Sequence, residues 1–263
     1  MHNSRSSRSG VFPNAIPVRW RHGSDWSRYV FALLATALGS AHAPLLWEEF
    51  EQASRHPEPY LPFMVGIAAY AVLWLLFLRR RRQFWRIWEH ETVHAVVATL
   101  LHRPVVAVEA TRGRGGRALS RARSGRRSAL VTLAPYIVPS FALLIPIFRV
   151  LVRAHLAVQA ANAALGYAVT YHLWSVFREA RPGQPDIKRV GRGVAYGVIV
   201  GFNVCLLTYL TALAGRGPEV LLEIATSAWE HVRLAITTGW SVAYHFLDTL
   251  VDHLKLLQYR RVS

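Results

Sequence analysis

The chain has 263 residues, of which 52% are hydrophobic and only 17% are charged. Its net charge of +16 would suggest nucleic-acid binding in a soluble protein, but the arginines cluster beside long apolar runs. Positive residues that flank membrane spans explain this pattern more simply, so we expect a membrane protein that binds no nucleic acid. The single cysteine, Cys205, lies within an apolar run and excludes an intramolecular disulfide.

Residues 1–28 are rich in Ser and Arg and predict a disordered, basic N-terminal segment. Residues 29–258 are expected to form a single membrane domain, because apolar runs recur along them and no soluble insert is large enough to be a separate domain. A bilayer-spanning helix needs about 20 apolar residues. Runs of roughly this length predict an all-α polytopic protein with about six transmembrane helices, near residues 29–47, 60–78, 129–152, 156–177, 193–214 and 229–251.

The flanking charges predict the orientation of these spans. Five arginines precede the first run, whereas acidic residues dominate between the first and second runs. The second run is followed by four consecutive arginines at 79–82, and more basic residues follow the fourth run and close the chain. Because cytoplasmic loops carry an excess of Lys and Arg, we expect a multi-pass protein with both termini cytoplasmic, in a bacterial cytoplasmic membrane.

Residues 85–102 are predicted to form a helix that contains His90-Glu91-Thr92-Val93-His94, an HExxH sequence. Residues four apart on a helix share one face, so both imidazoles can reach one zinc ion. Glu91 is then placed to polarise a metal-bound water, which is hydrolase chemistry. Ionisable residues at membrane depth are costly and usually functional, which strengthens the prediction. A purely structural interpretation is an interfacial helix with incidental histidines.

Residues 103–121 predict a short β-hairpin after the HExxH helix. Pro104 ends the helix, Val105-Val106-Ala107-Val108 favours a strand, and a Gly-rich stretch at 113–116 favours a turn before a return strand. The arginines of this segment favour a cytoplasmic or interfacial location. Farther along, three prolines interrupt the run at 129–152 and predict a helix that is kinked, or broken beside a cavity.

An apolar helix with His90-Glu91-Thr92-Val93-His94-Ala95 after a basic segment resembles the site-2 protease family of intramembrane zinc metalloproteases. In that family, a later aspartate at the cytoplasmic end of a more C-terminal span is the third zinc ligand. Asp186, in Gln184-Pro185-Asp186-Ile187, is the matching position, so the resemblance implies that Asp186 completes the ligand set. On its sequence context alone, Asp186 could instead cap the N-terminus of the next helix.

Further ionisable residues compete for a role at the metal. His172 lies in an apolar run at a predicted depth between those of His90 and His94, so it is an alternative or auxiliary ligand. It could equally be a hydrogen-bonded packing residue. A group with helical spacing near the C-terminus predicts a solvated face or, failing that, a second metal site or a third ligand: His245, Asp248, Asp252 and His253.

These features predict a membrane-embedded zinc metallopeptidase, in which His90, His94 and Asp186 bind Zn2+ and Glu91 is the general base. The expected partners are the lipid bilayer and a membrane-protein or peptide substrate that is cut near the cytoplasmic face. One alternative is a non-proteolytic zinc hydrolase or lipid-modifying metalloenzyme with the same ligands. Another is a non-enzymatic scaffold whose polybasic hairpin binds anionic lipid or a partner.

Overall fold

A computed structural model of the chain describes residues 26–78, 83–102, 105–111, 115–120 and 128–262. The arginine stretch at 79–82 and most of the predicted disordered segment at 1–28 lie outside the described residues. The described residues are nearly all helical, and two short strands accompany the helices.

The described helical segments are joined by short connections. In chain order they are α1 (Trp26–Arg55), η1 (Glu58–Tyr60), α2 (Leu61–Leu73), η2 (Trp74–Leu78), α3 (Gln83–Leu100), α4 (Ala129–Ile137), α5 (Ser140–Leu151), α6 (His155–Glu179), α7 (Pro185–Val190), α8 (Arg192–Arg216) and α9 (Val220–Val262). η1 is a turn of 3-10 helix, and η2 is a π-helical continuation of α2.

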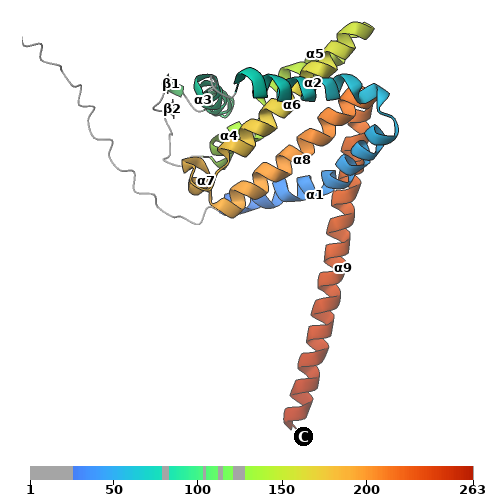
Figure 1. Cartoon of the computed structure of the whole chain (residues 1–263). Coiled ribbons are helices and arrows are strands. Elements are labelled where there is room, and N and C mark those ends of the chain that lie inside the picture. The colour runs from blue at the N-terminus through green and yellow to red at the C-terminus, as the bar shows by residue number, and fades with distance from the viewer. Residues whose placement is uncertain (1–25, 79–82, 103–104, 112–114, 121–127, 263) are drawn as a thin grey trace, which may run out of the picture.

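Three segments within the described residues are long and apolar enough to cross a membrane: Trp26–Arg55, Glu58–Phe77 and Arg192–Arg216. They coincide with the first, second and fifth predicted spans. α6 occupies the position of the fourth, while α9 contains the sixth and runs on well past the other helices in Figure 1. The apolar helices support a membrane protein, and the count of six spans stays a prediction.

The predicted span at 129–152 is two helices rather than one. α4 ends at Ile137 and α5 begins at Ser140. Val138 between them has an extended backbone, with φ −110° and ψ 105°, which is the conformation that a following proline favours. Pro139 also lacks the N–H that would continue the helical hydrogen bonds. The prolines therefore break this helix instead of only kinking it.

Two helix pairs with close backbone contact form the scaffold. α1 packs along α8, and α2 packs along α6 (Figure 1). A Cβ on Gly201 would lie 2.0 Å from the Ala35 carbonyl oxygen, and a Cβ on Gly66 would lie 1.9 Å from the Ala163 carbonyl oxygen. Neither glycine can be enlarged at this helix spacing, which is typical of small-residue contacts between membrane helices.

α3 lies outside these two pairs and packs against α4 and both strands. Val93 and Val97 of α3 are buried against Ala134 of α4. Since residues at this spacing share a helix face, these contacts fix which side of α3 points into the protein.

The strands β1 (Val105–Thr111) and β2 (Gly115–Ser120) pair antiparallel, with Val105 opposite Ser120 and Thr111 opposite Gly115. Residues 112–114, between the strands, lie outside the described residues. Both strands contact α3. The strand pair therefore lies against the helix that carries the HExxH sequence.

Candidate metal centre

α3 presents two histidines on the face that it buries. His90, Val93, His94 and Val97 follow the spacing of one helix face, so packing of the two valines against α4 also turns the histidines inward. Their side chains are only 14% and 13% exposed. The Nε2 atoms of the two imidazoles face each other at 3.2 Å.

The third member of the cluster comes from α7, a six-residue helix between α6 and α8. α7 begins at Pro185, whose fixed φ favours the first helical position, and it packs against α4 and α8. Asp186 Oδ2 lies 3.5 Å from His90 Nε2 and 3.4 Å from His94 Nε2. Two segments far apart in the sequence thus place three metal-ligating side chains together.

The three atoms form a nearly equilateral triangle with edges of 3.2, 3.4 and 3.5 Å. In a tetrahedral zinc site with bonds of roughly 2.0–2.1 Å, neighbouring ligand atoms are about 3.3 Å apart. Imidazole nitrogen and carboxylate oxygen are also ligand types that zinc takes in hydrolases. The residues therefore fit a zinc ion with three protein ligands and a fourth position for water or substrate.

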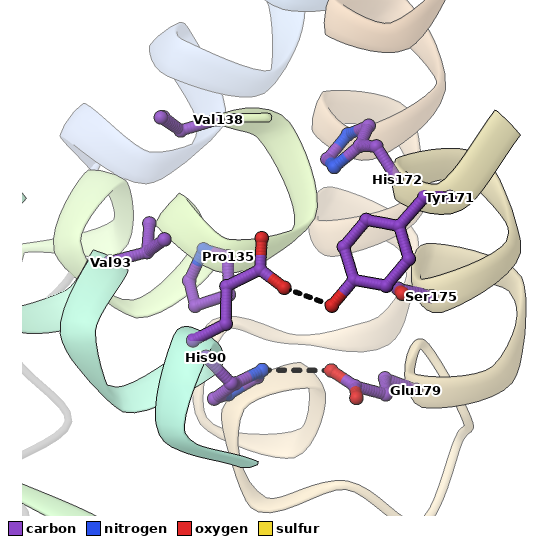
Figure 2. Close-up of a pocket in the computed structure, with 9 residues that line it drawn as sticks. His90, Val93, Pro135, Val138, Tyr171, His172, Ser175 and Glu179 are labelled. Carbon is purple, nitrogen blue, oxygen red and sulfur yellow. Dashed lines mark hydrogen bonds and ion pairs between the residues drawn. The ribbon is translucent and has the colours of Figure 1, made fainter. Parts of the chain in front are cut away.

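The outward-facing nitrogen of each imidazole donates a hydrogen bond. His90 Nδ1 donates to Glu179 Oε2 at 2.9 Å, as Figure 2 shows, and His94 Nδ1 donates to the Val131 carbonyl at 2.7 Å. A carboxylate and a carbonyl accept these bonds, so both Nδ1 atoms carry the hydrogen. In a neutral ring, Nε2 then has its lone pair directed into the cluster.

A proline explains why the Val131 carbonyl is available to His94. In an α-helix this carbonyl would accept a hydrogen bond from the N–H of residue 135. Residue 135 is a proline inside α4 and has no N–H. The helix therefore leaves the Val131 oxygen without its usual donor, and His94 Nδ1 takes that place.

The neighbouring carboxylates set the charge of the cluster. Burial lowers the pKa of His90, but hydrogen bonds to Asp186 and Glu179 outweigh burial and raise this pKa to about 9. Burial raises the pKa of Asp186, but hydrogen bonds from His90 and His94 outweigh burial and hold this pKa well below its usual range. Asp186 is therefore anionic, and its other oxygen, Oδ1, pairs with Arg189 Nη1 at 3.3 Å.

Glu91 follows His90 on α3 and is half-buried. No hydrogen bond or ion pair joins its carboxylate to another residue of the described ranges. Its charge acts on Tyr136, whose ring centroid lies 5.4 Å from that of His90. A carboxylate near the cluster without a fixed partner is suited to accept a proton, as the predicted role of general base requires.

A small pocket opens beside His90, between α3, α6 and the break that follows α4 (Figure 2). Across it, the Tyr171 hydroxyl of α6 donates a hydrogen bond to the Glu89 carboxylate of α3. The remaining lining residues are Val93, Pro135, Val138, His172, Ser175 and Glu179. The pocket therefore connects the metal-ligating face of α3 to a polar face of α6.

His172 lies outside the cluster of three. Its Nε2 donates to Asn203 Oδ1 at 3.1 Å, while Asn203 Nδ2 donates to the carbonyls of Tyr136 and Ile199. These two carbonyls fix the orientation of the amide, so His172 Nε2 carries a hydrogen and has no lone pair for a metal. His172 is therefore not part of the cluster within the described residues, and Nε2 is not its metal-binding atom.

Asp186 and the acidic and histidine residues near the C-terminus are also placed by the structure. Asp186 does not cap a helix, because the N-cap of α7 is Gln184 and this cap forms no side-chain hydrogen bond.

The C-terminal group of His245, Asp248, Asp252 and His253 lies on α9, where His245 is exposed. The side chains of Asp248, Asp252 and His253 lie outside the described ones.

The sequence interpretation missed both hydrogen-bond partners of the histidines. The sequence does contain a feature that singles out Glu179, because it is the one carboxylate between Glu109 and Asp186. Pro135 likewise marks the Val131 carbonyl, because a proline four residues later removes the helical donor of that carbonyl. Neither signal indicates which histidine the group faces, since that depends on tertiary packing.

Comparison with known proteins gives one family match. Residues 63–182 match the Peptidase M50B-like family, in a segment that includes the HExxH helix and Glu179 and ends before Asp186. The resemblance to the site-2 protease family that the HExxH helix suggested is confirmed. No curated protein and no solved structure matches the chain.

Asp186→Asn should remove most of the zinc affinity, whereas His172→Ala should keep it. The asparagine amide lacks the anionic ligand oxygen. The loss of zinc affinity should therefore exceed the roughly 10- to 100-fold loss that follows removal of a hydrogen-bond partner of a ligand. His172, by contrast, already uses Nε2 to bind Asn203. Elemental analysis and titration against a zinc chelator measure this, with about one zinc per chain expected in wild type and none in His94→Ala. A zinc-replete Asp186→Asn beside an empty His172→Ala would reverse the assignment.

Pro135→Ala should weaken zinc binding by up to roughly tenfold, because alanine returns an N–H that competes with His94 for the Val131 carbonyl. Pro146→Ala is the matched control, since Pro146 also lies inside a helix, α5, but belongs neither to the cluster nor to the lining of the pocket beside His90. The same chelator titration measures both variants. Equal affinities would show that the freed carbonyl does not hold His94.

Proposed function

We propose that this chain, which is similar to the Peptidase M50B-like family over residues 63–182, is a membrane-embedded zinc metallopeptidase. It would cut membrane-associated substrates near the cytoplasmic face. The observation that carries the proposal is the triangle of His90 Nε2, His94 Nε2 and Asp186 Oδ2, whose edges of 3.2, 3.4 and 3.5 Å suit a tetrahedral ion.

Zinc held by His90, His94 and Asp186 would supply Lewis acidity to the peptide carbonyl and lower the pKa of a water molecule. Glu91 accepts a proton from the attacking water as the new carbon–oxygen bond forms. It then gives that proton to the peptide nitrogen as the carbon–nitrogen bond breaks, so that an acid and an amine leave. The histidines stay out of this proton transfer, because their Nδ1 hydrogens are held by Glu179 and Val131.

The substrate must present an extended segment, because the carbonyls of an intact helix are occupied by hydrogen bonds. The strand pair offers a place where an extended segment could bind. β1 and β2 form a two-stranded sheet against α3, and within the described ranges each strand has an outer edge without a partner strand. An extended substrate segment added at such an edge would gain backbone hydrogen bonds beside the HExxH helix.

The charges of the helix ends support a cytoplasmic location of the site. α1 and α8 run in the same direction, since Ala35 lies against Gly201 and Glu49 pairs with Arg216 farther along both helices. Basic residues gather near the starts of both helices, where α7 also lies: Arg28, Lys188, Arg189 and Arg192. The positive-inside rule therefore favours a cytoplasmic location for this end and, by the same rule, for both chain termini.

Glu91→Gln should keep the zinc and lower cleavage by at least about 100-fold, because the amide preserves the shape of the side chain and removes the base. Purified protein in lipid vesicles would be given a set of tagged single-span membrane proteins, and fragments would be identified by mass spectrometry. Glu230→Gln, an exposed carboxylate of α9, is the control.

The outcome separates the competing functions. Cleavage that survives Glu91→Gln would assign the base to another residue. A zinc-loaded wild type that cuts none of these proteins but hydrolyses a lipid ester would favour a non-proteolytic hydrolase. A wild type without zinc would contradict both enzymes and favour the scaffold.

Cysteine labelling tests the orientation. In a Cys205→Ala background, Arg55→Cys should react with a membrane-impermeant reagent from outside the cell. Gln83→Cys and Lys188→Cys should react only after the membrane is opened. The opposite pattern would place the metal cluster on the outer side.

A further inference from the structure

Glu179 is the last residue of α6 and lies beside the metal-ligating face of α3. Its side chain is 15% exposed, and its Oε2 accepts the hydrogen bond from His90 Nδ1 at 2.9 Å. It also lines the pocket next to His90. A carboxylate in this position needs an explanation, because a partly buried anion is costly unless it is paired.

Helix stability does not supply that explanation. The C-terminus of a helix carries partial negative charge from its unpaired carbonyls, so a carboxylate in the last turn is unfavourable there. The contact with His90 offsets this cost, because it gives the carboxylate a hydrogen-bond donor in a largely buried region. The position of Glu179 is therefore better explained by the metal site than by the helix that carries it.

We infer that Glu179 is the positioning residue of the metal site: its carboxylate holds the His90 ring so that Nε2 points at the position shared by His94 and Asp186. This inference rests on the proposed zinc site. Because Glu179 accepts the Nδ1 hydrogen, it fixes the tautomer and the ring rotation of His90. The result is the observed distance of 3.5 Å between His90 Nε2 and Asp186 Oδ2.

The two histidines differ in the kind of partner that holds them. His94 donates to a backbone carbonyl, whereas His90 donates to a carboxylate. A charged acceptor gives a stronger hydrogen bond and makes the imidazole a more basic ligand. His90 should therefore be the ligand whose orientation depends most on a single side chain, that of Glu179.

Three variants separate positioning from general structure. Glu179→Ala removes the acceptor, Glu179→Gln keeps an acceptor oxygen without the charge, and Glu179→Asp keeps the charge on a shorter side chain. Glu223→Ala is the control, because Glu223 also pairs with a basic residue, Arg216, at the opposite end of α8. The readouts are zinc affinity by chelator competition and the visible absorption of the cobalt-substituted protein, which reports ligand geometry.

Zinc affinity should fall roughly 10- to 100-fold in Glu179→Ala, with an altered cobalt spectrum. Glu179→Gln should restore part of the affinity, because it keeps the acceptor oxygen but not the charge. Glu179→Asp should not restore it, because its oxygens are withdrawn from His90 Nδ1. Glu223→Ala should match wild type. Thermal unfolding of the metal-free proteins should differ little between Glu179→Ala and Glu179→Gln, so that the difference in affinity does not come from folding.

Wild-type affinity and spectrum in Glu179→Ala would overturn the inference while leaving the zinc site intact. Equal losses in Glu179→Ala and Glu179→Gln, with Glu179→Asp normal, would also overturn it, because charge and not ring position would then matter. A wild type that binds no zinc would instead contradict the proposed function itself.

Discussion

Two imidazole nitrogens that face each other at 3.2 Å impose the constraint on which this site depends. With their lone pairs directed at one point, and Asp186 beside them, the inner side of the cluster needs positive charge. The outer side needs acceptors that keep both hydrogens on Nδ1. α6 supplies one acceptor through Glu179, and α4 supplies the other through Val131. The site is thus a joint product of four helices, although its three metal-ligating residues come from two.

Packing far from the cluster determines where these acceptors and ligands lie. α6, which ends at Glu179, is held against α2 by backbone contacts at Gly66 and Gly166. α7, which carries Asp186, is held by burial of Ile187 and Val190 in a core shared with α8. Because both helices are fixed by close contact, Glu179 and Asp186 reach α3 from set directions. Looser packing at Gly66 and Gly166 would therefore disturb the metal site indirectly, by moving α6.

The sequence predicted the parts of the site that follow a local rule. His90 and His94 follow from helical spacing, and Asp186 follows from the family motif. The local sequence around His172 does not show which atom its Nε2 faces, because that partner, Asn203, is 31 residues away and accepts the Nε2 hydrogen. In the span at 129–152, by contrast, the local signal was present: Pro139 forces Val138 into an extended backbone, and the sequence left open only whether the helix kinks or breaks there.

Charge balance gives Glu179 a second role besides orienting His90. With both histidines neutral, Asp186 and Glu179 bring two negative charges into a largely buried region, where an unpaired charge costs on the order of several kcal/mol. Arg189 offsets only the first of them, through its contact with Asp186 Oδ1 at 3.3 Å. In the metal-free protein, the raised pKa of His90 reflects a proton that offsets part of this charge. A divalent ion at the triangle would displace that proton and make the group of four residues neutral overall. The carboxylate of Glu179 thus adds negative charge beside the three ligands, which favours a dication at the triangle in a region of low dielectric.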